Sequence, residues 1–66
     1  MLNGIKIREL RNSKGYTTLD LSKFTKISKS YLEELERGDK KNPSFSKVVY
    51  IADALGVKVD DLILKA

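Results

Sequence analysis

Side chains that can form hydrogen bonds and ion pairs gather on one short segment of the chain, Ser28–Gly38. Ser28 is suited to start a helix because its hydroxyl can accept an unpaired backbone N–H, and Gly38 can adopt the left-handed conformation that ends one. Tyr31, Leu32 and Leu35 fall at helical spacing and form a narrow apolar strip. The opposite side carries Lys29, Ser30, Glu33, Glu34 and Arg37. We therefore expect a short helix with few anchoring residues and a polar face.

The composition argues against catalysis. The 66 residues include no histidine and no cysteine, so the commonest general base and the usual metal ligands are missing. There is no glycine-rich phosphate loop, and the carboxylates form no acid–base constellation. We expect no enzyme, no metal and no cofactor. No small-molecule effector is expected either, because the chain leaves no room for a second domain.

Length and charge indicate a single small domain with an anionic partner. A chain of 66 residues forms a minimal core, and it has neither a signal segment nor an apolar run long enough for a membrane. We expect a soluble, cytoplasmic protein. The net charge is +4, and residues 1–47 hold eleven basic and six acidic residues. This uneven charge favours a nucleic acid partner, although a surface adapted for solubility would show a similar excess.

Capping signals predict the elements that must position this polar face. Asn3 and Gly15 bound a helix over about residues 3–14, in which Ile7, Leu10 and Arg11 share a face. Thr17 caps a helix over 18–25, with Asp20 three residues later as in a capping box. Only Lys26 and Ile27 then precede the helix over 28–37. Two short helices joined by so tight a turn indicate a helix-turn-helix.

The rest of the chain completes a compact all-α fold. Ser44, after Pro43, can cap a helix over 45–55, where Val48, Ile51 and Leu55 form the apolar face. A last short helix is expected over 60–65. We find no convincing strand and no repeat, so residues 1–66 are predicted to form a single domain of five helices.

The order of these motifs resembles the lambda-repressor-like, or XRE (Cro/repressor-type), helix-turn-helix regulators of bacteria and phages. The likeness is closest to their SinR-like branch and covers nearly the whole chain. It is carried by Ile7-Arg-Glu-Leu-Arg11, Lys14-Gly-Tyr-Thr17, Leu21-Ser22, Ile27-Ser-Lys-Ser-Tyr-Leu32, Leu35-Glu-Arg-Gly38, Asn42-Pro-Ser44, Ile51-Ala-Asp-Ala-Leu-Gly-Val57 and Asp60-Asp-Leu62.

This resemblance implies that the helix over 28–37 lies in the major groove of double-stranded DNA. Lys29, Ser30 and Glu34 would then contact base edges, with Lys29 donating to guanine and Glu34 accepting from cytosine. The residues expected to contact phosphate groups are Thr17, Thr18, Lys26, Arg37, Lys40, Lys41, Asn42 and Ser44. For Thr17 and Ser44, plain helix capping is the alternative interpretation. The resemblance also implies an interior ion pair between Arg11 and Glu36.

Three residue choices depart from the family pattern. Thr18 stands where glutamine is common, and Lys26 replaces the usual glycine of the turn, which carries strain if that position needs a positive φ. The third departure is the acidic content of the helix over 28–37, which holds three glutamates beside Lys29 and Arg37. Carboxylates are repelled by phosphates, so we expect affinity to depend on the flanking basic residues.

Together these features predict a sequence-specific DNA-binding transcriptional regulator, a repressor that acts on the nucleoid as a homodimer on a pseudo-palindrome. Surplus apolar surface at the end of the chain, at Val59, Ile63 and Leu64, is expected to form the dimer interface. Val49 and Tyr50 are possible additions. The alternative is a protein-interaction module on the same fold, such as an antitoxin or a repressor antagonist, which the acidic helix would favour.

Overall fold

A computed structural model describes residues 1–40 and 42–64 of the chain. Four α-helices follow one another: α1 (Gly4–Ser13), α2 (Thr18–Thr25), α3 (Lys29–Arg37) and α4 (Phe45–Leu55). A 3-10 helix, η1 (Val59–Leu62), completes the order of elements. Among the described residues the only extended pairing is an isolated bridge between Leu2 and Ile63. The predicted all-α fold is therefore confirmed.

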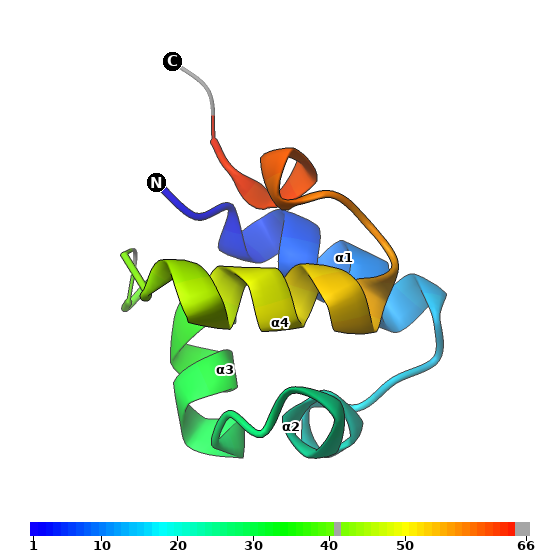
Figure 1. Cartoon of the computed structure of the whole chain (residues 1–66). Helices are drawn as coiled ribbons and strands as arrows, with labels where there is room; N and C mark the ends of the chain where they lie inside the picture. Colours follow the sequence, from blue (N-terminus) through cyan, green and yellow to red (C-terminus); the bar gives the residue numbers. More distant parts are fainter. Residues whose placement is uncertain (41, 65–66) are drawn as a thin grey trace.

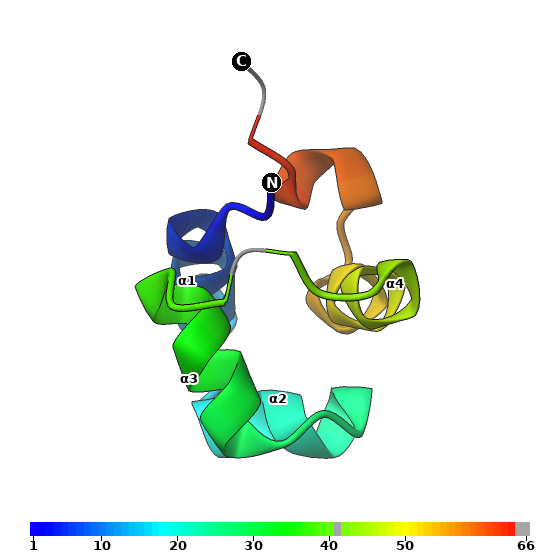
Figure 2. The same ribbon diagram turned by 90° about the vertical axis from the view of Figure 1, so that its left-hand side faces the viewer.

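The helices are arranged around a small interior with α2 at one end and α3 connecting it to α1. In Figure 1, α4 crosses the front of the molecule, α1 lies behind it, and α3 descends to α2 at the bottom. The view turned by 90° agrees, because α2 again lies at the end opposite to the chain termini (Figure 2). α2 and the start of α3 thus lie at the end of the molecule away from residues 1–4, whereas the carboxyl end of α3 lies beside α1.

Short side chains and aliphatic residues from every element fill the core. Its fully buried large side chains are Ile7, Leu21, Leu32, Leu35, Ile51, Leu55 and Leu62. α3 contributes only Leu32 and Leu35 to this set, with Tyr31 half-buried beside them. Burial of a leucine contributes about 1.5–3 kcal/mol, so Leu32 and Leu35 are the main apolar anchors of this nine-residue helix. Its exposed residues are Lys29, Ser30 and Arg37.

Local capping explains where the helices begin. The side chains of Asn3, Thr17, Ser28 and Ser44 each accept a hydrogen bond from a backbone N–H in the first turn that follows. Because these contacts involve neighbours in sequence, the sequence predicts the bounds of α1 to α4 to within one residue. Gly38, at φ +86°, ends α3 in the left-handed conformation.

The predicted helix over 60–65 is wrong in type and extent. The chain forms one 3-10 turn, Val59–Leu62, and Ile63 is already extended, at φ −105° and ψ 129°. The reason is pairing with the start of the chain: the Asn3 N–H donates to the Leu62 carbonyl, and the Leu64 N–H donates to the Met1 carbonyl, both at 2.7 Å. Residue 65 lies outside the described residues.

Phe24 of α2 is exposed although it lies one helical turn from the buried Leu21. Phe24 shares the helical spacing of Leu21, yet its side chain is 57% exposed. It packs edge-on against Tyr16, with ring centroids 5.0 Å apart. The interior position belongs instead to Thr25, which is buried and donates its hydroxyl to the Leu21 carbonyl at 2.8 Å.

Candidate nucleic-acid interface

The amino end of α3 presents exposed polar side chains beyond the body of the fold. Ser28 caps the helix by accepting from the Tyr31 N–H at 3.2 Å. Lys29 and Ser30, in the first turn, are exposed, and Glu34 is half-exposed one turn later. These are the three residues predicted to contact bases, and the structure places them on the part of α3 that is not used for packing.

Lys29 is not free in this arrangement. Its Nζ donates to Glu33 Oε2 at 2.8 Å, one helical turn along α3. The same carboxylate oxygen accepts from Thr18 Oγ1 of α2 at 3.3 Å. The hydrogen bond from Lys29 is the main reason why the pKa of Glu33 is lowered, with smaller contributions from Thr18 and Arg37. Glu33 therefore links the two helices of the helix-turn-helix through one carboxylate oxygen.

α2 begins with a capping box. The Thr17 hydroxyl accepts from the Asp20 N–H at 3.0 Å, and the Thr17 N–H donates to Asp20 Oδ2 at 2.9 Å. This backbone hydrogen bond lowers the pKa of Asp20. The capping interpretation of Thr17 is thus correct for its side chain, while the N–H groups at the start of α2 have no partners within the helix.

The turn between α2 and α3 is made by Lys26 in the left-handed conformation, at φ +63° and ψ 22°. Lys26 is the only residue other than glycine with a positive φ among those that the structure describes. Its backbone N–H donates to the Ser22 carbonyl at 2.9 Å. The side chain is exposed, so the position where the family has glycine carries a cation beside the start of α3.

A largely buried ion pair joins α1 to α3. Arg11 donates to Glu36 through Nε at 2.7 Å and Nη2 at 3.0 Å, and its Nη1 donates to the Tyr16 carbonyl at 2.8 Å. Only 12% of the Arg11 side chain and 7% of the Glu36 side chain are exposed. Hydrogen bonding to Glu36 raises the pKa of Arg11, against the opposing effect of burial. The pair implied by the family resemblance is present.

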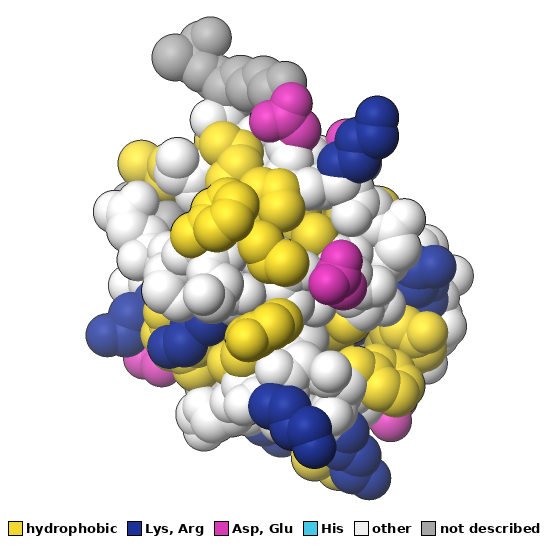
Figure 3. Space-filling view, in the orientation of Figure 1, with side chains coloured by type: hydrophobic (Ala, Val, Ile, Leu, Met, Phe, Trp, Pro, Cys, Tyr) yellow, Lys and Arg dark blue, Asp and Glu magenta, His cyan; other side chains and the backbone are white. Residues whose placement is uncertain are grey.

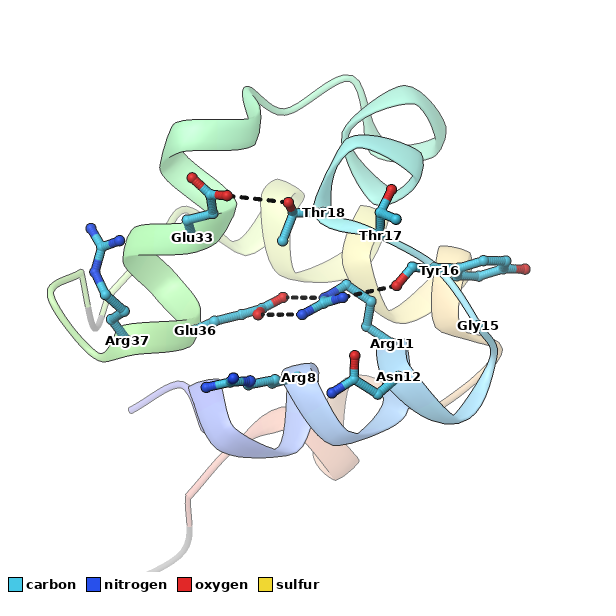
Figure 4. Close-up of a pocket in the computed structure, with 10 residues that line it drawn as sticks. All are labelled: Arg8, Arg11, Asn12, Gly15, Tyr16, Thr17, Thr18, Glu33, Glu36 and Arg37. Atoms are coloured by element: carbon cyan, nitrogen blue, oxygen red, sulfur yellow. Dashed lines mark hydrogen bonds and ion pairs between the residues drawn. The ribbon is translucent and has the colours of Figure 1, made fainter.

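A polar hollow of about 600 Å³ opens beside this ion pair (Figure 4). Its walls come from α1, the α1–α2 connection, the start of α2 and the outer side of α3. The lining residues are Arg8, Arg11, Asn12, Gly15, Tyr16, Thr17, Thr18, Glu33, Glu36 and Arg37. Arg8 and Asn12 are lining residues that were not predicted from the sequence. The signal was available, because Arg8, Arg11 and Asn12 share one face of a helix at spacings of three and four residues.

The remaining residues predicted to contact phosphate lie around the α3–α4 connection. Arg37 is exposed and donates to Asp39 Oδ2 at 2.9 Å, and this hydrogen bond raises the pKa of Arg37. Lys40 and Asn42 are exposed, and Lys41 lies outside the described residues. Asn42 borders a separate small hollow with Met1, Leu2, Pro43, Val48 and Ile63. The structure thus brings Arg37 together with Thr17 and Thr18 but not Asn42.

Ser44 caps α4 by accepting from the Lys47 N–H at 3.4 Å, as the capping interpretation predicts. Lys47 in turn places its Nζ 4.3 Å from the centre of the Tyr31 ring. This cation–π contact links α4 to α3.

Apolar side chains gather on the face that α4 and η1 share (Figure 3). Among the residues predicted to form a dimer interface, Val59 and Ile63 are half-buried, and Leu64 is 48% exposed. Tyr50 of α4 is 52% exposed, and Val49 is half-buried. Leu62 is fully buried and belongs to the core.

The described part of the chain contains neither a membrane-spanning helix nor a cluster of metal ligands. No helix there is long and apolar enough to cross a membrane. No group of three or more acidic, histidine or cysteine side chains is gathered there in a way that suits a metal ion.

A family model described as helix-turn-helix matches residues 7–62. The chain is similar to an immunity repressor of Bacillus phage phi105, with 35% identity over 63 residues, covering 96% of this chain and 43% of the repressor. It is also similar to solved structures of the regulator SinR. The comparison with the crystal structure of SinR in complex with DNA gives a TM-score of 0.87 and 33% sequence identity, and it covers 91% of this chain and 98% of the SinR chain.

The comparison with a chain of the SinR–SinI complex gives a TM-score of 0.82 and 34% sequence identity, and it covers 89% of this chain and 56% of that chain of the complex. The chain spans about half the length of the curated relatives that it matches, at 43%, 44% and 54% for the phage repressor, a Deinococcus deserti regulator and Bacillus subtilis SinR. The likeness therefore concerns one domain of those proteins.

Proposed function

Because the chain belongs to the XRE-type helix-turn-helix family of DNA-binding transcriptional regulators, we propose that it is a sequence-specific repressor that inserts α3 into the major groove of double-stranded DNA. The observation that carries this proposal is the division of α3 into two sides. Leu32 and Leu35 are buried, whereas Lys29 and Ser30 at its amino end are exposed. Such a protein would act on the nucleoid, in the cytoplasm.

Base contacts come from the exposed first turns of α3. Lys29 donates to the O6 and N7 atoms of a guanine, and Ser30 contacts the neighbouring base. Glu34 accepts from a cytosine amino group, a less common contact. One good base contact provides about 1–3 kcal/mol of discrimination against the wrong base.

Phosphate contacts come from the elements around α3. At the start of α2, Thr18 contacts a phosphate through its backbone N–H, and Thr17, whose N–H is taken by Asp20, does so through the O–H of its side chain. Cations follow at Lys26, Arg37, Lys40 and Lys41, and polar contacts at Asn42 and at the start of α4, at Ser44. These contacts fix the position of α3 on the duplex without reading its sequence.

We further propose that the functional unit is a homodimer on a pseudo-palindromic operator. One recognition helix contacts too few base pairs for a specific site, and two half-sites one helical turn apart match a two-fold axis. Val59, Ile63 and Leu64, with Val49 and Tyr50 beside them, form the self-complementary surface. The exposed apolar side chains of α4 and η1 in Figure 3 support this choice.

A second candidate function is binding of a protein partner, as an antitoxin or a repressor antagonist. It is favoured by the three carboxylates of α3, at Glu33, Glu34 and Glu36. SinR itself has been solved in complex with the protein SinI. Glu36 is paired with Arg11 and Glu33 with Lys29, whereas Glu34 lies within the electrostatic influence of Arg37 without a hydrogen-bonded ion pair to it.

Selection from random duplex DNA, followed by titration of the selected duplex against salt, separates the two functions. A specific regulator enriches a palindromic motif and loses affinity with salt along a log–log slope that reflects several phosphate contacts. Sedimentation equilibrium tests the dimer, and Leu64→Glu is expected to shift it toward the monomer. A folded protein that enriches no motif would contradict the DNA-binding proposal and favour the protein partner.

A further inference from the structure

One carboxylate oxygen connects the two helices of the helix-turn-helix. Glu33 Oε2 accepts from Lys29 Nζ at 2.8 Å and from Thr18 Oγ1 at 3.3 Å. Figure 4 shows the Thr18 contact, in which the side chains of α2 and α3 point toward each other. Glu33 is therefore not simply a solvated surface charge.

We propose that Glu33 is a positioning residue that holds Lys29 in the orientation in which it recognises its base, and so determines sequence specificity. This inference rests on the proposed function of α3 in the major groove. It assigns to Glu33 a contribution to discrimination between bases, although Glu33 itself contacts none.

The hydrogen-bond capacity of Lys29 allows both contacts at once. An ammonium group has three donors, and the Lys29 Nζ gives one of them to Glu33. Two donors remain for the O6 and N7 acceptors of a guanine. A lysine side chain is otherwise a long, flexible stem with a compact charge, so the contact with Glu33 restricts its orientations before DNA arrives.

The charge of Glu33 explains why the effect concerns specificity rather than affinity. The hydrogen bond from Lys29 lowers the pKa of Glu33 and so favours its ionised form. An ionised carboxylate at a DNA-facing surface is repelled by phosphate groups and weakens binding to every sequence. Because the charge of Glu33 weakens binding to every sequence, any advantage that Glu33 gives to the preferred sequence comes from the orientation of Lys29.

Thr18 supplies the second support. A hydroxyl has a single O–H donor, and Thr18 gives it to Glu33. The Thr18 side chain therefore serves to hold Glu33 from α2 instead of donating to a phosphate. Any phosphate contact at Thr18 then comes from its backbone N–H.

The test compares Glu33→Gln and Glu33→Ala with the parent in selection from random duplexes, and Lys29→Ala identifies the base that Lys29 recognises. Glutamine keeps an acceptor oxygen for Lys29 and Thr18 but removes the charge. We expect Glu33→Gln to keep the preference at that base to within about twofold and Glu33→Ala to lose about fivefold or more. Both variants should bind random DNA more tightly than the parent at low salt.

Glu9→Gln and Glu9→Ala, at an exposed glutamate of α1, are the matched controls for a change in net charge and should leave the base preference unchanged. If Glu33→Ala retains the parental preference at the base of Lys29, the positioning role is overturned while the DNA-binding function stands. A parent protein that enriches no motif overturns both. Thermal unfolding of each variant verifies that it is folded.

Discussion

Gly4 of α1 lies against the backbone of Leu35 of α3, so closely that a Cβ atom at Gly4 would overlap the Leu35 carbonyl oxygen. The same Cβ would be 3.0 Å from the Glu36 carbonyl oxygen. Both atoms belong to the backbone and cannot move aside as the end of a flexible side chain would. α1 and α3 thus approach at a point that accepts no side chain, one residue from the ion pair of Glu36.

Gly4→Ala is therefore expected to destabilise the protein, by about 1–3 kcal/mol. This reverses the usual effect, because glycine to alanine in an exposed helix stabilises by about 0.5–1 kcal/mol. Urea unfolding followed by circular dichroism measures the change. Ser46→Ala, at an exposed position of α4, is the control and should be neutral or slightly stabilising. An alanine at position 4 that raises the free energy of unfolding would contradict the close approach.

Arg11→Ala should destabilise the fold by about 3 kcal/mol, because it leaves the largely buried Glu36 carboxylate without its partner. Since a core of this size contributes only about 3–5 kcal/mol of net stability, a large unfolded fraction is expected at 25 °C. Denaturant titration in a stabilising osmolyte quantifies the loss. Arg8→Ala, at an exposed arginine one turn earlier, is the control. Equal midpoints for the two variants would show that the ion pair contributes nothing.

Lys26 provides a test of backbone strain in the turn. Lys26→Gly and Lys26→Ala remove the same charge, but only glycine adopts φ +63° without a steric cost. The glycine variant should therefore be more stable than the alanine variant by about 1 kcal/mol. Thermal unfolding of the pair measures the difference. Both should bind DNA more weakly than the parent and by similar factors, whereas identical melting temperatures would argue against strain at this position.

Lys29 and Lys40 are expected to differ in the kind of binding that they support. Lys29→Ala should relax the base preference at one position of the operator, at a cost of about 1–3 kcal/mol for the preferred sequence. Lys40→Ala should weaken all sequences about equally and reduce the salt slope by about one unit per subunit. Titration of specific and random duplexes at several salt concentrations distinguishes them. A reversal of the two patterns would place the base contacts in the α3–α4 connection.

The capping box of α2 predicts a dependence of stability on pH. The pKa of Asp20 is lower in the folded protein, because the Thr17 N–H donates to its carboxylate. Its contribution is therefore present above the unfolded pKa of about 3.9 and is lost as the pH falls through the lower folded value. Asp20→Asn should be less stable than the parent at pH 6, and the difference should shrink toward pH 3. Thermal unfolding between these values measures it, and a gap that widens in acid would contradict the sign.

Sequence alone identified the helices and the family because the relevant signals are local or occur in order along the chain. Thr17, Ser28 and Ser44 cap helices through backbone N–H groups three residues away, so no knowledge of the fold is needed to place α2, α3 and α4. The exposed polar face of α3 follows from the same periodicity, since Leu32 and Leu35 must turn inward.

The tertiary structure decided the contacts between residues far apart in the chain. Glu33 meets Thr18 across 15 positions, and the strand-like end at Ile63 replaces the expected helix because it pairs with Leu2. Phe24 stays exposed although its spacing suits the core. Each outcome depends on the angles at which the helices pack, and those angles result from the combined shape of side chains from every element. Local spacing does not contain that information.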